Sequence, residues 1–328
     1  MKLRGNIFKN TRLVAALVVL AVIILGYFLA ASAPMPGAPN GTFTVSQNTG
    51  TSAIIEGLKT HGFIKTKWAF SLALTLQGTN RILPGGYEIS KGMSAWQLAK
   101  ALYQGPTQKW ISIPEGLRKE EIAEILAKQL SWSAAEKQKW IDVYTAPDSD
   151  HTEGVYFPDT YLIPNNESPA DTAKRLRNHF EEKFAPAAKE AAKQNIKWDT
   201  LLKIASLVQR EAGGQTDMPI IAGIIWNRLL QGMKLDIDAT IQYARGNTGN
   251  GWWAPISASD KQLDTPYNTY MYKGLPPHPI CNPGLEAINA VLHPSETKCL
   301  YYLHDSNGQI HCAETYEQHL QNVATYLR

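Results

Sequence analysis

A single glutamate at the end of an apolar helical segment is the residue of this sequence best suited to acid catalysis. Residues 199–211 read DTLLKIASLVQRE, with two glycines shortly after. At 100° per residue, Ile204 and Val208 lie on one apolar stripe, and Glu211 lies on its flank. A carboxyl beside an apolar face and near a helix C-terminus holds its proton more tightly than a free glutamate does. Glu211 is therefore a candidate general acid; the alternative is a glutamate that frays into solvent.

The helix that carries Glu211 is expected to begin at Asp199, which is well suited to an N-cap position. A second apolar helix is expected after it, within residues 218–244, closed by Asn227 and Arg228 and followed by Asp236, Asp238, Thr240 and Tyr243. These two helices would position the polar residues that come after them.

Residues 265–284, TPYNTYMYKGLPPHPICNPG, form a loop too rich in Tyr, Asn, Pro and Gly to be ordinary core. Tyrosine faces stack on sugar rings, and amide groups donate hydrogen bonds to hydroxyl and N-acetyl groups. Tyr270 offers such a ring, and Asn268 offers such an amide. The loop is therefore suited to carbohydrate recognition.

The N-terminus carries the signature of a membrane segment. Four basic residues and no acids lie within residues 1–12, and residues 13–31 form an uncharged apolar run of 19 residues. A helix of this length can cross the hydrocarbon core of a bilayer. The positive-inside rule then leaves residues 1–12 in the cytoplasm and exports the rest. A cleaved signal peptide is the alternative, because Ala31-Ser32-Ala33 resembles a cleavage site.

The remaining charge argues against a nucleic-acid surface. The chain carries a formal charge of +3, and without the four basic residues of the tail the remainder is close to −1. The sequence contains no phosphate-binding glycine loop, no serine nucleophile elbow and no basic helix. Five of the eight histidines lie between residues 278 and 319, but none forms a metal-ligand pair such as HExxH. We therefore expect no metal and no cofactor, and interpret His293, His304 and His311 as hydrogen-bonded core or rim residues.

The three cysteines, Cys281, Cys299 and Cys312, all lie in the last fifty residues. Cys299 and Cys312 flank a predicted hairpin in which pairing His304 with Gln309 sets the two cysteines diagonally. A disulfide is possible in this register but not favoured, and buried thiols are the alternative.

Residues 32–41 have a linker composition, and the folded part is expected to start near Thr42. Residues 42–62, 85–105 and 109–130 each read as strand, turn and amphipathic helix. Such small αβ units suit LysM-type carbohydrate-binding modules, with a spacer that binds nothing as the alternative.

Residues 154–164, GVYFPDTYLIP, are interpreted as aromatic core, with a sugar-stacking surface as the alternative. Residues 168–196 are expected to form a solvated helix pair.

Six blocks in a fixed order make this sequence resemble the MltG-type, or YceG-like, endolytic murein transglycosylases over nearly its whole length. They are the membrane run with its LysM-like region, FPDTY, ASLVQRE, the NRL…GM.L..D.T..Y block, TPYNTY…GLPP…NPG, and HP…YLH…G.H…T…H. No single block is specific, but their order and spacing are.

The resemblance implies an α+β protein with the following parts: a cytoplasmic tail (1–12), a transmembrane helix (13–31), a linker (32–41), a LysM-like αβ region (42–145) and a mixed α/β YceG-like catalytic domain (146–328). It implies a single-pass protein of the cytoplasmic membrane, with its catalytic domain on the outer side. Peptidoglycan strands would be its substrate, and peptidoglycan synthases are possible partners.

The resemblance also implies the reaction: cleavage of MurNAc-β-1,4-GlcNAc bonds inside glycan strands, leaving 1,6-anhydro-MurNAc ends. The family's catalytic acid is the second acidic position of its Ala-Ser…Glu-x-Glu pattern, which is Glu211 here. Gln209 replaces the first, and its place on the helix suggests that it is peripheral. By the same matching, Asp238, Thr240, Asn268 and Tyr270 are expected to line the cleft. A non-catalytic cell-wall binding or scaffold protein is the alternative.

Overall fold

The computed structural model describes residues 3–78, 81–145 and 152–327, with side chains from residue 13 onward. It is a mixed α+β protein with two compact units. Unit 1 comprises residues 1–110 and 162–165, and unit 2 comprises residues 111–161 and 166–328. The chain passes from unit 1 to unit 2 near residue 110, whereas the resemblance implied a boundary at residue 145. The domain limits and the LysM-like assignment stay predictions.

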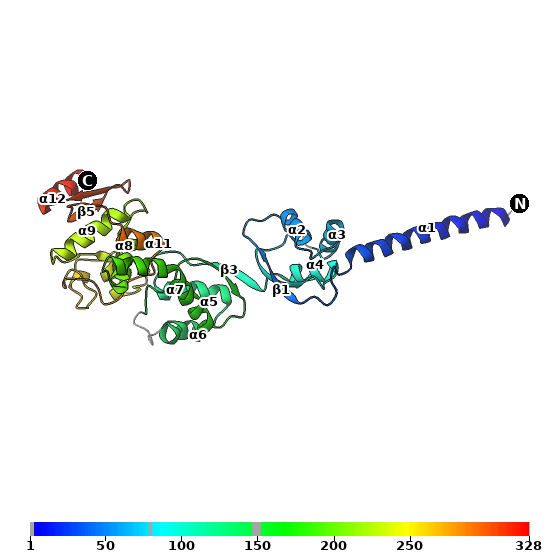
Figure 1. Cartoon of the computed structure of the whole chain (residues 1–328), viewed down its shortest axis with the longest axis horizontal. Coiled ribbons are helices and arrows are strands. Elements are labelled where there is room, and N and C mark those ends of the chain that lie inside the picture. Colours follow the sequence, from blue (N-terminus) through cyan, green and yellow to red (C-terminus); the bar gives the residue numbers. More distant parts are fainter. Residues whose placement is uncertain (1–2, 79–80, 146–151, 328) are drawn as a thin grey trace. The chain divides into compact units, whose positions relative to one another are not determined.

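Unit 1 combines a long apolar helix with a small αβ fold (Figure 1). Its elements are α1 (Leu3–Ala31), β1 (Asn40–Val45), α2 (Thr51–Thr60), α3 (Lys67–Leu76), β2 (Gly85–Ser90) and α4 (Ala95–Gln104). Strands β1 and β2 are antiparallel, with Phe43 opposite Tyr87. The first two predicted repeats therefore share one strand pair and one core, which runs from Ala31 to Leu102.

Helix α1 has the only stretch, among the described residues, that is long and apolar enough to cross a membrane. This stretch is Leu13–Ala31, with a mean hydropathy of 3.0. Its last residue, Ala31, is only 6% exposed and belongs to the core of unit 1.

Strands β3 (Gln108–Ser112) and β4 (Thr160–Pro164) complete a four-stranded sheet in the order β1-β2-β3-β4. The predicted core segment 154–164 leads into β4. Tyr156 and Ile163 are fully buried and Phe157 is 5% exposed, which confirms the core interpretation.

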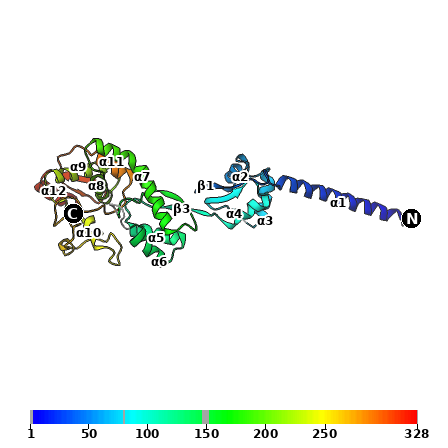
Figure 2. The same cartoon turned by 60° about the horizontal axis from the view of Figure 1, so that its bottom comes forward.

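Unit 2 is mostly helical. Its helices are α5 (Lys119–Leu130), α6 (Ala134–Lys139), the π-helical turn η1 (Trp140–Tyr144), α7 (Pro169–Lys193), α8 (Trp198–Glu211), α9 (Met218–Leu230), α10 (Asp238–Arg245), the 3₁₀ turn η2 (Asp260–Gln262), α11 (Leu285–Leu292) and α12 (Tyr316–Tyr326). Helix α8 is the centre of this unit: it packs against α7, α9, α10 and α11, and the α8 and α11 ribbons lie side by side in both views (Figures 1 and 2).

Two details of the predicted helices are wrong. Residues 169–193 form one continuous helix, α7, rather than a pair, although Pro186 lies inside it. Its apolar face is buried both before the proline, at Phe184, and after it, at Ala187, so packing on both sides of the proline outweighs the hydrogen bond that proline removes. Helix α8 is capped by Lys197, not Asp199; Asp199 lies in the first turn, where its charge favours the helix dipole, and pairs with Lys203 at 2.8 Å.

The C-terminal hairpin consists of β5 (Tyr301–His304) and β6 (Ile310–Ala313), and its register differs by one residue from the prediction. His304 faces Ile310 rather than Gln309. The extra turn residue is Gln309: the Asp305 amide donates to the Gln309 carbonyl, and Gly308, with a φ of 78°, closes this longer turn.

A disulfide joins Cys299 and Cys312 with a Cα–Cα distance of 5.8 Å. The expectation that a bridge was not favoured is therefore wrong. It extended the strand pairing to Cys299, but Cys299 precedes β5, and the chain there brings it close to Cys312, which itself pairs with Tyr302. Cys281 is a free, buried thiol, as the alternative expected for all three cysteines.

We expect loss of this disulfide to loosen the hairpin that carries β5 and β6. A bridge that closes a loop of 13 residues restricts the unfolded chain by about 3 kcal/mol. In the Cys299→Ser/Cys312→Ser variant, the free energy of hairpin opening, measured by amide hydrogen exchange, should fall by about that amount. Wild type and Cys281→Ala should show the same loss only after reduction; hairpin protection that ignores reductant in wild type would contradict the bridge.

Candidate active site

Glu211 is the last residue of α8, and its side chain is half-buried. Every residue of α8 from Leu201 to Val208 is buried except Lys203, and this burial fixes the helix in the core. The fully buried Ser206 hydroxyl accepts a hydrogen bond from the Ile280 amide at 3.1 Å, which ties the helix to the loop before α11. Glu211 is thus held on a rigid support.

A cavity of about 470 Å³ opens at Glu211. Tyrosines from three elements, a histidine and several charged groups line it: Glu211, Arg228, Leu235, Asp236, Lys261, Tyr270, Tyr301, Tyr302, Tyr316 and His319. Ring faces beside a carboxyl are the groups that a sugar site requires.

Tyr302 on β5 holds the Glu211 carboxyl. Its hydroxyl donates to Glu211 Oε2 at 2.5 Å, across 91 positions of sequence. Burial raises the pKa of Tyr302 well above its ordinary value, and the charge of Glu211 raises it further. Tyr302 therefore stays protonated and acts as a hydrogen-bond donor.

The surroundings of Glu211 raise the pKa of its carboxyl above the ordinary glutamate value. Burial is the largest cause, and the charge of Asp238 adds to it. The Tyr302 hydrogen bond opposes the shift, as do His304 and Arg210 to a smaller extent. The net direction is the one that a general acid needs.

A second acid, Glu153, has an even clearer shift, because burial raises the pKa of its carboxyl to about 8. Glu153 is fully buried, however, and its oxygens accept hydrogen bonds from the Lys119 amide and from the Asn282 side chain at 2.7 Å. It does not line the cavity. Of the two acids, only Glu211 combines a raised pKa with access to a cavity.

The two glycines after Glu211 form a turn around Asp217. The amides of Gly213 and Gly214 each donate to an Asp217 carboxylate oxygen at 3.0 Å, and the other partner of that carboxylate is His304 Nε2 at 2.7 Å. Burial alone would raise the pKa of Asp217, but the hydrogen bonds from His304 and the amides lower it. A side chain at Gly213 would come within 3.3 Å of His304, so the glycine permits this close packing.

Gln209 faces away from the cavity. Its Oε1 accepts a hydrogen bond from the Gly284 amide at 3.0 Å. A glutamate at this position offers the same acceptor, so the substitution preserves the contact. This placement supports the peripheral role expected for residue 209.

Tyr270 and Lys261 line the cavity, whereas Asp238, which was expected to line the cleft, is not in the lining and contacts both of them. The Tyr270 hydroxyl donates to Asp238, and Lys261 Nζ lies 3.9 Å from the same carboxylate. The Lys261 ammonium also lies 4.2 Å from the centre of the Tyr270 ring. Tyr270 and Lys261 thus form a charged and aromatic wall of the cavity, which Asp238 supports from behind.

Thr240 and Asn268, which were expected to line the cleft, are fully buried. The Thr240 hydroxyl donates to the Ile237 carbonyl at 2.7 Å, and the Asn268 amide donates to the carbonyls of Lys261 and Leu263. The Asn268 side-chain oxygen also accepts from the Tyr270 amide. The Asn268 contacts fix the loop that carries Tyr270. The burial of Thr240 and Asn268 does not favour direct contact of either residue with substrate.

The expected histidine contacts are present: His293 bonds Glu190 at 3.0 Å, His304 bonds Asp217, and His311 bonds Asp305 at 3.1 Å. Across residues 3–78, 81–145 and 152–327, no group of three or more His, Cys, Asp or Glu side chains could hold a metal ion.

Sequence reasoning missed Tyr302, Lys261 and the aromatic group of Tyr301, Tyr316 and His319. Tyr301 lies 5.8 Å from Tyr316 and stacks on His319 at 5.6 Å. Tyr302 belongs to the YLH block of the sequence. That block identified the strand, but not the contact of Tyr302 with Glu211.

A sequence model of the YceG-like family matches residues 43–325. The endolytic murein transglycosylase of Bacillus subtilis (strain 168) is 29% identical over 305 residues, which cover 86% of this chain and 84% of that protein. The endolytic murein transglycosylase of Streptococcus pneumoniae serotype 2 (strain D39) is also 29% identical, over 89% of this chain but only 58% of its own length. The crystal structure of a yceG-like protein from Listeria monocytogenes matches 87% of this chain and 99% of its own with a TM-score of 0.60 at 25% identity.

Proposed function

The chain belongs to the YceG-like family, and from this we propose that it is a membrane-anchored lytic transglycosylase that cuts peptidoglycan strands internally. The observation that carries the proposal is the half-buried Glu211 carboxyl, with a raised pKa, at a cavity lined by tyrosines. The similarity to endolytic murein transglycosylases over 86–89% of the chain supports the same activity.

In this proposal, protonated Glu211 gives its proton to the glycosidic oxygen between MurNAc and GlcNAc. The bond from the MurNAc C1 atom to that oxygen breaks, and positive charge develops at C1. The Glu211 carboxylate then takes the proton of the C6 hydroxyl of the same MurNAc ring, and O6 bonds to C1. The products are a free GlcNAc hydroxyl and a 1,6-anhydro-MurNAc end, with Glu211 protonated again.

This scheme needs only one enzymic carboxyl. The nucleophile is a hydroxyl carried by the same sugar residue, and well-oriented intramolecular groups reach effective concentrations on the order of 10⁵ M or more. The other acid in the cavity lining, Asp236, lies 3.4 Å from Arg228, and Asp238, which is outside the lining, accepts a hydrogen bond from Tyr270. Tyr302 serves as the donor that stabilises Glu211 once it has given up its proton.

The proposal includes a retained anchor. Ala31-Ser32-Ala33, the candidate cleavage site, begins at a buried residue at the end of a continuous helix. The Ser32 hydroxyl bonds both the Leu29 carbonyl and Lys65. Proteolysis favours exposed, flexible segments, so these contacts favour a helix that stays attached. The Cys299–Cys312 disulfide is consistent with an extracytoplasmic unit 2.

Digestion of purified peptidoglycan by the full chain in detergent, followed by mass spectrometry, tests the activity. We expect internal cuts whose new ends are lighter by one water than ordinary reducing ends. Reducing ends would indicate hydrolysis, with water as acceptor, and would contradict the intramolecular step. No cleavage, with binding retained, would favour the non-catalytic scaffold.

A further inference from the structure

Unit 1 carries an apolar face beside the outer end of α1. We define this juxtamembrane face by six residues from α1, α3 and α4: Tyr27, Phe28, Trp68, Leu72, Leu76 and Trp96. Trp68, Leu72 and Leu76 are spaced by four residues along α3 and are 55%, 44% and 62% exposed. The opposite side of α3 is fully committed to the core of unit 1. Soluble surfaces rarely expose so many large apolar side chains together.

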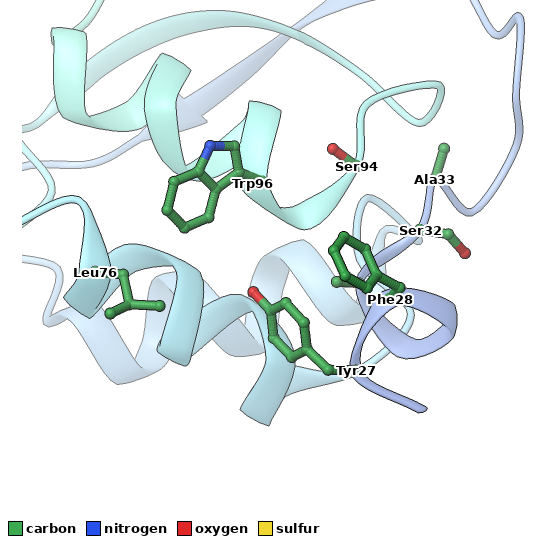
Figure 3. A pocket seen from close by; sticks show the side chains of 8 residues that line it. Tyr27, Phe28, Ser32, Ala33, Leu76, Ser94 and Trp96 are labelled. Carbon is green, nitrogen blue, oxygen red and sulfur yellow. The ribbon is translucent and has the colours of Figure 1, made fainter. Parts of the chain in front are cut away.

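An apolar cavity of about 590 Å³ lies within this face. Figure 3 shows Tyr27 and Phe28 of α1 on one side of the cavity, with Leu76 of α3 and Trp96 of α4 around it. The Tyr27 hydroxyl is shielded from solvent and, among the described residues, has no hydrogen-bond partner. An acceptor oxygen that enters the cavity together with apolar atoms would satisfy it.

The position of the face identifies what covers it. The apolar span of α1 ends at Ala31, and the start of α3 contacts that end: the Thr66 hydroxyl donates to the Ala30 carbonyl at 3.4 Å. The ring of Trp68 lies 5.9 Å from the ring of Tyr27, four residues before the end of the span. At 1.5 Å per residue, Tyr27 lies about 6 Å inside the apolar span. The face therefore begins within the depth of the bilayer.

The chemistry around the face matches the boundary between acyl chains and headgroups. Tryptophan and tyrosine are enriched at this boundary. Lys65 Nζ bonds Ser32 at 2.7 Å, and Lys59 Nζ bonds the Lys65 carbonyl at 2.7 Å, so two ammonium groups lie at the outer end of the span, in reach of lipid phosphates. The Thr75 hydroxyl, on the same side of α3, donates to the Ser71 carbonyl at 3.0 Å and needs no water.

We propose that the juxtamembrane face lies in the outer leaflet of the bilayer that α1 spans, with a phospholipid acyl chain in the cavity and an ester or phosphate oxygen at Tyr27. The inference rests on the retained anchor of the proposed function. It makes unit 1 a membrane-docked element rather than a free spacer between the anchor and the rest of the chain.

Fluorescence quenching by brominated phospholipids tests this docking. The full chain is reconstituted in phosphatidylethanolamine and phosphatidylglycerol vesicles that contain lipids brominated either near the headgroup end or near the methyl end of the acyl chain. Helix α1 contains no tryptophan, so Trp68 and Trp96 are the reporters among the nine of the chain. We expect quenching that is stronger with the shallow bromines and that is mostly lost in Trp68→Phe/Trp96→Phe. Trp198→Phe, which removes a 40% exposed tryptophan of unit 2, should keep the quenching.

Quenching that is absent in wild type, or that survives the double substitution, would overturn the docking. Cross-linking of Trp68→Cys to a second copy, with the remaining tryptophan unquenched, would also overturn it and assign the face to self-association. Resistance of the protein to alkaline extraction from the vesicles reports the anchor separately. An extractable protein means that the anchor fails, whereas an inserted protein without quenching means that only the docking fails.

Discussion

Glu211→Gln is expected to lower the rate of 1,6-anhydro-muropeptide release by about 10²- to 10⁴-fold, the range that general acid catalysis supplies. Glutamine keeps the size of the side chain and an acceptor for the Tyr302 hydroxyl. It has no acidic proton to give to the glycosidic oxygen and no carboxylate to accept the C6 proton. The measurement is the initial rate of product release from purified peptidoglycan, with thermal unfolding as the check that the variant folds like wild type.

Two control variants test other carboxyl groups: one at a buried acid that shares the raised pKa of Glu211, and one introduced two residues before Glu211 on the same helix. Glu153→Gln removes the other acid with a raised pKa, which is sealed in the core, and should leave the rate per folded molecule unchanged. Gln209→Glu adds a carboxyl two residues before Glu211 but keeps the acceptor for the Gly284 amide, so its rate should stay within a few-fold of wild type. Wild-type activity in Glu211→Gln would show that another group donates the proton.

The position of Glu211 at the edge of a buried helix face could be predicted from sequence because it depends on one helix. Helical periodicity alone places Glu211 on the flank of the apolar stripe through Ile204 and Val208. In the structure both residues of that stripe are buried. The same reasoning placed Gln209 away from the stripe, where it bonds Gly284. Local periodicity is reliable where an amphipathic helix is long and its polar and apolar residues are well separated.

The partner of Glu211 could not be found in the same way. Tyr302 reaches Glu211 from a strand 91 residues later, and which side chains of β5 face α8 depends on the hairpin register. A shift of one residue reverses the faces of a strand. Gln309 is the residue added to the turn. The Cys299–Cys312 bridge was missed for another reason, because Cys299 precedes β5 and the strand pairing does not determine its place.

Thr240 and Asn268 illustrate a second limit. Their residue types suit a sugar site, but type alone does not distinguish a side chain that contacts a ligand from one that supports the loop. Asn268 bonds four backbone groups around itself, which makes it the anchor of the loop rather than part of its surface. Only the tertiary structure could separate it from Tyr270, two residues later.

Tyr302→Phe is expected to lower kcat/KM by about 10- to 100-fold, the equivalent of one hydrogen bond to a charged group. It should also shift the pH profile. Glu211 acts in its protonated form, so activity falls as the pH rises through the pKa of this carboxyl. The Tyr302 hydrogen bond favours the ionised carboxyl and lowers that pKa; without it the pKa rises further, and the descending limb should move to higher pH. The measurement is kcat/KM for peptidoglycan cleavage across the pH range.

Tyr301→Phe is the matched control, since Tyr301 precedes Tyr302 on β5 and lines the same cavity, but contacts Tyr316 and His319. Its loss of a hydroxyl can change the rate but should leave the descending limb where it is in wild type. A purely structural role for Tyr302 would lower the rate of Tyr302→Phe at every pH by the same factor. Movement of the limb in Tyr302→Phe alone would therefore show that the Tyr302 hydroxyl lowers the pKa of Glu211, and an unmoved limb would contradict that role.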